Sequence, residues 1–269
     1  MKKILTIAGS DSGGGAGIQT DLKTIALLGG HGTSVLTALT AQNTLGVQGV
    51  HPVPEAFIRQ QMDSVLTDIG TDTLKIGMLA TAGIVRTVAE GLRALTAAPL
   101  VLDPVMVATS GGPLLAEDAR QSLQDELFPL AAVVTPNLGE AELLCGFPVT
   151  DRASMEQAAA AIHARGPAYV LLKGGHLVDD AADLLFDGHQ GIWLPGHRVD
   201  TVHTHGTGCT YSAAIATFLA QSGDMVQAVA QAKRFITRAI AAAEPLGHGR
   251  GPTNPFAAVF GTDDAHASA

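Results

Sequence analysis

Short apolar segments alternate with alanine-rich helical segments along the whole chain, and this alternation limits most strongly what the chain can fold into. Runs of leucine and β-branched residues predict buried strands at 4–8, 33–39, 74–76, 100–102, 133–135 and 169–172. The segments between and after them predict helices at 18–28, 55–67, 83–95, 117–123, 138–144, 154–165, 208–220 and 225–243. Continuously apolar strands joined by helices indicate an α/β fold, in which helices cover both faces of a mostly parallel sheet.

We expect a single domain over residues 1–269, because no segment has the composition of a linker and no internal repeat is present. Two features interrupt the alternation. Residues 183–186 and 191–194, joined by Asp187-Gly188, predict an antiparallel hairpin. Residues 40–53 lack a helical period and predict an extended flap, and residues 261–269 are expected to be a frayed tail.

Composition excludes several classes of partner. The chain is 46% hydrophobic and has a net charge of −9 without a basic run, so nucleic acid and anionic membranes are not expected partners. No segment approaches the roughly 18–20 apolar residues of a membrane span, and the short apolar start fits a first strand better than a signal peptide. Two cysteines, Cys145 and Cys209, cannot form a disulfide framework, which favours a cytoplasmic location.

Polar and glycine-rich segments follow the expected strands. They are Gly9 to Gly17, Gly77-Met78, Asp103-Pro104, Thr135-Pro136-Asn137 and Lys173-Gly174-Gly175-His176. The carboxyl ends of parallel strands lie at one edge of a sheet, where ligands bind in such folds. We therefore expect these segments to converge on one active site.

The segment from His203 to Thr210, His-Thr-His-Gly-Thr-Gly-Cys-Thr, places Cys209 behind two glycines where a helix is expected to begin. A helix start offers unpaired amides and about half a positive charge, which bind anions and favour thiolate over thiol. Cys209 is therefore predicted to be a base or nucleophile beside a phosphate-sized anion. A zinc site made by His203, His205 and Cys209 is a weaker alternative because no fourth ligand is evident. Cys145 is most simply a core residue.

The glycine-rich segment 9–17 contains no dinucleotide-binding pattern, and the chain contains no Walker phosphate loop. If the protein uses ATP, it does so without that loop. One interpretation of the segment is a flexible turn between strand and helix. We favour the close approach of a flat substrate to the backbone, with Asp21 following on the first turns of the helix.

Acids and an amide at two strand ends suggest a metal site. Asn137 and Glu140, three residues apart, are expected on one face of a helix and, with Asp103, suit Mg²⁺ bound to phosphates. Acids at a helix start can also merely complement its dipole, the simpler interpretation for Glu142. Lys173 is either a solvated surface residue or a residue that neutralises phosphate, and we favour the second role.

Taken together, these blocks resemble the ribokinase-like kinases, and among them the hydroxymethylpyrimidine/phosphomethylpyrimidine kinases. The matching blocks are 8–19, 37–47, 75–79, 103–107, 135–137 with Glu140, 172–176 and 204–210. Each block alone is weak, but their order and spacing over the whole chain are specific. The resemblance implies a three-layer αβα sandwich with a small flap, and a homodimer.

The same resemblance implies the reaction. The γ-phosphoryl group of ATP, bound with Mg²⁺, would be transferred to 4-amino-5-hydroxymethyl-2-methylpyrimidine, and a second transfer would make the diphosphate. Cys209 would be the base on the hydroxymethyl group, and the amides of Gly206, Thr207 and Gly208 would stabilise the transferring phosphoryl group. Many relatives in the wider superfamily have an aspartate at the position of Cys209.

The remaining roles implied by the resemblance fall into two groups. Around the pyrimidine, Gln42 would read the ring edge, and the pocket would be lined by Asp21, Gly9, Met78 and Val105. Around the nucleotide, Asn137, Lys173 and Thr207 would bind phosphate, and Asp103 and Glu140 would hold the metal. Adenine is expected near the last two predicted helices.

Three positions depart from the family pattern, namely His203, Thr109 and Gly139, where asparagine, lysine and proline are common. His203 and Thr109 are expected to alter contacts with the nucleotide. Two other functions stay open: a pyridoxal or pyridoxine kinase of the same fold, whose substrate also has a hydroxymethyl group, and a vitamin-binding protein without turnover. Gln42 favours the aminopyrimidine, and the set Asp103, Glu140, Lys173 and Cys209 disfavours a mere binder.

Overall fold

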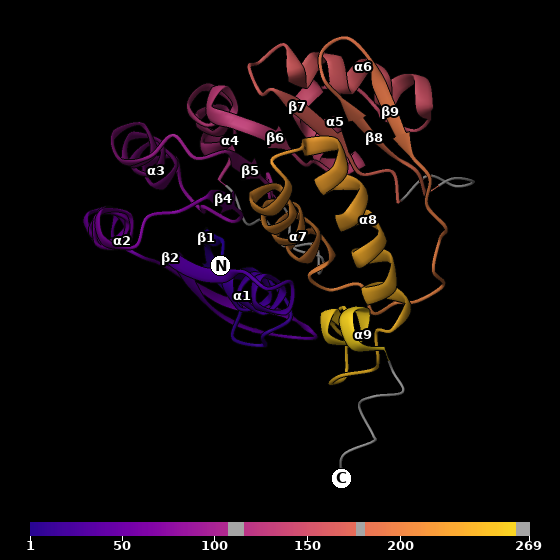
Figure 1. Cartoon of the computed structure of the whole chain (residues 1–269), viewed down its shortest axis with the longest axis horizontal. Helices are drawn as coiled ribbons and strands as arrows, with labels where there is room; N and C mark the ends of the chain where they lie inside the picture. The colour runs from indigo at the N-terminus through magenta and orange to yellow at the C-terminus, as the bar shows by residue number, and fades with distance from the viewer. Residues whose placement is uncertain (107–115, 176–180, 262–269) are drawn as a thin grey trace.

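The structure is a computed structural model, and it describes residues 1–106, 116–175 and 181–261. The strands are β1 (Lys3–Ser10), β2 (His31–Asn43), β3 (Gly46–Pro52), β4 (Thr73–Ile76), β5 (Leu100–Leu102), β6 (Ala131–Val134), β7 (Tyr169–Leu172), β8 (Asp183–Phe186) and β9 (Gly191–Leu194). Within the described residues they form one nine-stranded sheet in the order β3-β2-β1-β4-β5-β6-β7-β8-β9 (Figure 1).

The centre of the sheet is parallel and its two edges are antiparallel. Strands β2, β1, β4, β5, β6 and β7 pair in parallel, so their carboxyl ends share one edge of the sheet. The predicted hairpin of residues 183–186 and 191–194 is confirmed as β8 and β9. The predicted flap is confirmed as extended chain: the end of β2 pairs with β3, from Ala38 opposite Pro52 to Asn43 opposite Gly46.

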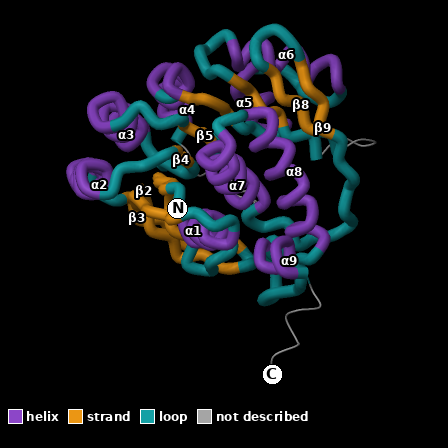
Figure 2. The backbone as a smooth tube through the Cα atoms, in the orientation of Figure 1, coloured by secondary structure: helices purple, strands orange, loops and turns teal. Residues whose placement is uncertain are grey.

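Helices cover both faces of the sheet, as predicted (Figure 2). One face packs against α2 (Glu55–Asp68), α3 (Ala82–Leu95), α4 (Glu117–Glu126), α5 (Leu138–Cys145) and α6 (Arg152–His163). The other packs against α1 (Gly17–Leu27), α7 (Thr207–Ser222) and α8 (Met225–Ala241), with α9 (Pro255–Phe260) against α8. The fold is therefore the three-layer αβα sandwich that the family resemblance implies.

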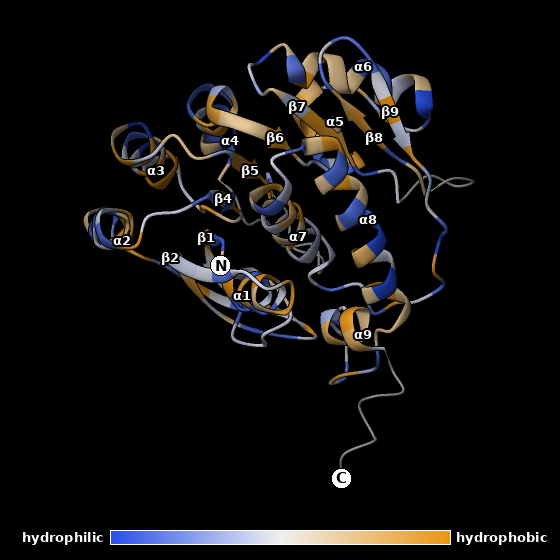
Figure 3. Ribbon diagram, in the orientation of Figure 1, coloured by the Kyte–Doolittle hydropathy of each residue, from blue (hydrophilic) through white to orange (hydrophobic). Residues whose placement is uncertain are grey.

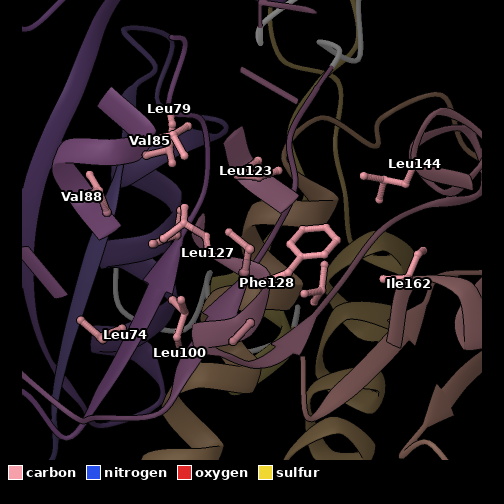
Figure 4. Close-up of a cluster of buried hydrophobic side chains, with 14 of the residues drawn as sticks. Leu74, Leu79, Val85, Val88, Leu100, Leu123, Leu127, Phe128, Leu144 and Ile162 are labelled. Carbon is pink, nitrogen blue, oxygen red and sulfur yellow. The ribbon is translucent and has the colours of Figure 1, made fainter. Parts of the chain in front are cut away.

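Alternating strand residues build two cores. In β5, Leu100 and Leu102 point to the first core and Val101 to the second. Figure 4 shows part of the first core, where Leu127 and the fully buried Phe128 pack among leucine and valine side chains of the strands and helices. Burial of one such side chain contributes about 1.5–3 kcal/mol. Figure 3 shows the hydropathy of the elements: β6 and β7 are hydrophobic, whereas hydrophilic and hydrophobic residues alternate along α8.

The other predicted elements are found within a few residues of their expected bounds. The helix α9 was not predicted; it is six residues long, begins at Pro255 and is capped by Asn254. Residues 262–269 of the predicted tail lie outside the described residues. None of the helices in the described ranges has both the length and the apolar character needed to cross a bilayer.

Candidate active site

A cavity of about 770 Å³ lies at the carboxyl ends of the parallel strands, where the sequence places the site. Nearly all of the predicted site residues line it, and Asp21 is the exception. The lining residues among them are Gly9, Gln42, Met78, Asp103, Val105, Asn137, Glu140, Lys173, Gly206, Thr207, Gly208 and Cys209. The cavity thus brings together segments that are far apart in the chain.

The start of α7 rests on the glycine-rich loop between β1 and α1. Gly206 precedes this helix with a φ of 75°, and a Cβ atom there would collide with the carbonyl oxygen of Gly15. No side chain of the described residues caps the helix. The amide of Thr207 donates to Thr204 O, so one of the three amides predicted to bind the phosphoryl group is already bonded. Even so, an uncapped start of a long helix at a cavity is suited to an anion.

Asp11 organises the loop beneath that helix start, a role the sequence reasoning missed. Its carboxylate accepts hydrogen bonds from the amides of Gly13, Gly15 and Ala16 and from His205 Nε2 at 2.9 Å. Burial opposes the charge, but the bonds from His205 and the amides hold the pKa of Asp11 below its usual value. The available signal was an acid inside a glycine-rich loop after a strand.

Gln42 reaches the cavity from β2. Its Nε2 lies 3.4 Å from His205 Nε2, and its Oε1 accepts a hydrogen bond from Thr40 Oγ1. The backbone of Gln42 is bonded in both directions to Ser12 Oγ, at 2.8 and 2.9 Å. The flap residue is therefore fixed to the glycine-rich loop, and its amide faces the same cavity as Cys209.

Gly9, near the end of β1, leaves room for the Met78 side chain in one wall of the cavity. We call this wall, lined by Gly9, Met78 and Val105, the cavity floor. A Cβ atom on Gly9 would lie only 3.1 Å from Met78 Sδ. Met78 and Val105 are partly exposed to the cavity. A thioether and a branched side chain give this part of the cavity an apolar surface for a flat ring.

A lysine and a carboxylate lie beside the start of α7. Lys173 Nζ is 3.0 Å from Asp103 Oδ1, which also accepts from Thr135 Oγ1. A Cβ atom on Gly208 would lie 3.1 Å from Asp103 Oδ2 and 3.4 Å from Lys173 Nζ. Burial disfavours the ammonium, but the charges of Asp103 and Glu140 raise the pKa of Lys173 above its usual value. Lys173 is therefore a largely buried cation beside the start of α7 rather than a solvated surface residue, and its predicted role in neutralising phosphate stays a prediction.

The structure corrects the expected geometry of Asn137 and Glu140. Asn137 Oδ1 accepts from the Glu140 amide and Glu140 Oε2 accepts from the Asn137 amide, which is a capping box. Their oxygens therefore do not simply point into the cavity, because the unpaired amides of the helix start attract them first. Glu142 does not serve the helix start either, since its Oε1 accepts from the Val149 amide.

Glu140 nevertheless remains a candidate metal ligand. Burial raises the pKa of Glu140 to about 7, although Lys173 opposes the shift. Two buried carboxylates, from Asp103 and Glu140, fit the preference of Mg²⁺ for a few oxygen ligands completed by water and phosphate. The described residues contain no group of three His, Cys, Asp or Glu that could hold a metal by itself. His203 Nδ1 accepts from the Gly251 amide and His205 pairs with Asp11, so the zinc alternative loses two of its ligands.

Cys209 differs from the expectation of a favoured thiolate. Burial raises the pKa of Cys209 to about 11, although the charge of Lys75 and a hydrogen bond from the Gly17 amide oppose the shift. The expectation was wrong because the sequence shows the helix start but not the desolvation of the thiol, and here desolvation dominates. The thiol therefore carries its proton at neutral pH in the free protein.

The prediction that Asp21 lines the ring pocket is also wrong. Its side chain is fully buried, with Oδ2 2.7 Å from Lys75 Nζ and 2.6 Å from Thr6 Oγ1. Asp21 lies on the face of α1 that packs against the sheet, so it points below the cavity rather than into it. Lys75, in the middle of an apolar strand, is a second residue that the sequence reasoning left without a role.

The raised pKa of Glu140 predicts that the stability of the protein depends on pH. A carboxyl with a raised folded-state pKa binds more protons folded than unfolded, so its ionisation costs stability as pH rises from about 4.5 to 7. Glu140→Gln keeps the capping box but removes this cost. The melting temperature of the variant minus that of the parent should rise by roughly 3 °C or more between pH 5 and pH 8. A constant difference, measured by calorimetry, would contradict the raised pKa.

The uncapped start of α7 and Lys173 are suited to binding a phosphate, and the carboxylates of Asp103 and Glu140 are suited to binding a divalent cation. The sheet is mostly parallel and covered by helices on both faces, as expected. Fold and site together define a small-molecule kinase of the ribokinase-like class. The profile of the phosphomethylpyrimidine kinase family matches residues 11–254. The chain is 53% identical, over 93% of its length and 93% of the relative, to the hydroxymethylpyrimidine/phosphomethylpyrimidine kinase of Streptomyces coelicolor. The chain therefore belongs to the phosphomethylpyrimidine kinase family.

The chain is also similar to a longer bifunctional protein and to a kinase that is named for another substrate. The chain is 52% identical over 95% of its length to the thiamine biosynthesis bifunctional protein of Geobacter sulfurreducens, and spans 52% of that protein. It also superposes on the ADP complex of Bacillus subtilis pyridoxal kinase with a TM-score of 0.90 and 41% identity, covering 97% of this chain and 99% of the other. The family, the fold class and the kinase activity predicted from the sequence are thus confirmed.

Proposed function

We propose that this chain transfers the γ-phosphoryl group of ATP to the hydroxymethyl oxygen of 4-amino-5-hydroxymethyl-2-methylpyrimidine, and then phosphorylates the monophosphate to the diphosphate. One observation carries the proposal: Cys209, at an uncapped helix start beside Lys173, shares a single cavity with Gln42. The name of the Streptomyces coelicolor relative, and the thiamine biosynthesis role in the name of the Geobacter protein, support it.

The ring binds between the flap and the floor of the cavity. Gln42 offers a donor and an acceptor side by side, which match the amino group and ring nitrogen of an aminopyrimidine. Met78 and Val105 contact the ring faces, and Gly9 leaves room for the side chain of Met78. Asp21 contributes no contact, because it lies beneath this surface.

In the transfer step the hydroxymethyl oxygen bonds to the γ-phosphorus while the bond between that phosphorus and the oxygen of ADP breaks. The amides of Gly206 and Gly208, that of Thr207 once released from Thr204, and the ammonium of Lys173 stabilise the charge on the equatorial oxygens. Cys209 Sγ, as thiolate, receives the hydroxyl proton. Only a minority of the free protein carries that thiolate at neutral pH, since the pKa of Cys209 is about 11.

Asp103 and Glu140 would hold Mg²⁺. When bound, the ion neutralises phosphate charge and orients the polyphosphate. Asn137 Oδ1 is occupied in the capping box, so Asn137 serves the nucleotide through its side-chain NH₂ group.

The adenosine end of ATP lies toward α8. There the cavity is lined by Ile236 and Ile240 of α8, with Val199 from the segment between β9 and α7. These apolar side chains suit a purine face, and the ADP complex of the Bacillus subtilis relative supports nucleotide binding in this fold. Of the departures expected to touch the nucleotide, His203 is bonded to the Gly251 amide and Thr109 lies outside the described residues.

We further propose a cytoplasmic homodimer that binds neither nucleic acid nor membranes. The net charge of −9 supports the absence of nucleic-acid and membrane partners. The homodimer is supported by exposed apolar side chains on and beside the flap: Leu39 is 46% exposed, Leu45 64% and Phe57 55%.

Pyridoxal phosphorylation is a second candidate function. It is favoured by the similarity to the Bacillus subtilis pyridoxal kinase. The test is ADP release with Mg-ATP on hydroxymethylpyrimidine, on its monophosphate and on pyridoxal. We expect turnover of both pyrimidines and at least tenfold lower kcat/KM on pyridoxal. Turnover of pyridoxal alone would overturn the substrate, and no turnover of any would favour the non-catalytic vitamin-binding function.

Cys209→Ala should lower kcat by roughly 10²–10⁴, the usual contribution of a general base, with substrate affinity little changed. ADP release and calorimetric binding measure the two quantities. Cys145→Ala is the matched control, because Cys145 ends α5 outside the cavity and its Sγ contacts Ala158 O. Near-normal turnover of the Cys209 variant would remove Cys209 from the proton transfer.

Gln42→Leu should raise KM for the pyrimidine by roughly tenfold or more, since the ring loses its hydrogen-bond partners, while KM for ATP stays within about threefold. Gln48→Leu removes an exposed amide from β3 of the same flap and serves as the control. Equal changes in both KM values would show that Gln42 shapes the flap rather than reads the ring.

A further inference from the structure

The buried ion pair of Lys75 and Asp21 has no part in the mechanism above. Both side chains are fully buried, and Lys75 Nζ lies 2.7 Å from Asp21 Oδ2. Asp21 Oδ1 has no hydrogen-bond partner among the described residues. Replacing such a pair by apolar side chains of similar size is often neutral or stabilising. Stability alone therefore gives little reason for a lysine inside β4.

The position of the pair relates it to Cys209. A Cβ atom on Gly77 would lie 2.8 Å from Lys75 Nζ and 3.2 Å from Ala8 Cβ. Ala8 lines the cavity that Cys209 also lines, so the ammonium lies close behind a residue of the cavity wall without lining the cavity itself. The thiol of Cys209 accepts from the Gly17 amide, and Asp21 is one helical turn further along α1.

The charges around the thiol come from four elements. Lys75 on β4 favours the thiolate, whereas Asp21 on α1 and Asp103 after β5 disfavour it. Lys173 after β7 also interacts with the Cys209 charge. Burial would lower the pKa of Lys75, but the charges of Asp21, Cys209 and Asp103 raise it above its usual value, so the ammonium stays charged.

We propose that Lys75, kept charged by Asp21, is a positioning residue that stabilises the thiolate of Cys209 from behind the cavity wall. The pair touches neither the pyrimidine nor the nucleotide, since it does not line the cavity that the described residues form. The ammonium supplies the positive charge that the desolvated thiol needs when its proton leaves. This inference rests on the role proposed for Cys209.

The test measures the thiol directly. Iodoacetamide alkylates thiolates, and mass spectrometry of the Cys209 and Cys145 peptides follows both cysteines of the full-length protein between pH 7.5 and 10.5. In Lys75→Met/Asp21→Asn, the Cys209 alkylation rate at pH 9 should fall roughly tenfold, with its pH profile displaced to higher pH. The Cys145 profile should not change. The double variant is used because Lys75→Met alone leaves an unpaired buried carboxylate that can prevent folding.

Thr73→Val is the matched control. Thr73 lies on the same face of β4, is buried and donates to Ala216 O of α7, so the variant disturbs the same packing without removing a charge. Its Cys209 profile should match the parent. A purely structural pair would give the double variant an unchanged pH midpoint, or faster alkylation through loosened packing, and either result would overturn the inference.

Kinetics separate the inference from the proposed function. The double variant should lose at least tenfold in kcat, with KM for the pyrimidine and for ATP within about threefold. A displaced alkylation profile with unchanged kcat supports the electrostatic coupling and rejects Cys209 as the proton acceptor. An unchanged alkylation profile overturns the coupling whatever happens to kcat.

Discussion

The carboxylate of Asp11 is the interaction on which the rest of the site depends. It accepts hydrogen bonds from the amides of Gly15 and Ala16 in the turn that follows β1. Its bond with His205 also fixes the segment that leads into α7. His205 in turn lies against Gln42 of the flap. One acid thus determines the relative positions of three segments that are up to 194 residues apart in the chain. Buried carboxylates with several donors keep their charge, so this connection persists over a wide pH range.

The fold was predictable from the sequence because its signals are local. A strand such as 100–102, apolar at every position, has to be covered on both faces, and the structure places Leu100 and Val101 in different cores. The short helix α9 was not predicted because six residues are too few to show a helical period of apolar residues. The positions of the site residues followed from the topology, which brings the carboxyl ends of the parallel strands together.

The direction and ionisation of individual side chains were not predictable in the same way. Asp21 was expected at the ring, but its partner Lys75 lies on a strand that is distant in sequence. Asn137 and Glu140 bond to each other's backbone, because a helix start competes with any ligand for their oxygens. The charge state of Cys209 depends on a balance between burial and neighbouring charges, and both are properties of the folded molecule.

The contact between Gly206 and Gly15 divides the site into two parts with different freedom to vary. At the end proposed to bind phosphate, the main chain of Gly206 packs against that of Gly15, and no side chain larger than hydrogen fits at Gly206. The end proposed to bind the ring is lined largely by side chains, and one of them, Gln42, lies on the hairpin at the edge of the sheet. With these proposed roles, mutations in that hairpin would alter which alcohol is accepted while the transfer chemistry is preserved. Such a scaffold can therefore acquire new acceptors over evolution without passing through inactive forms.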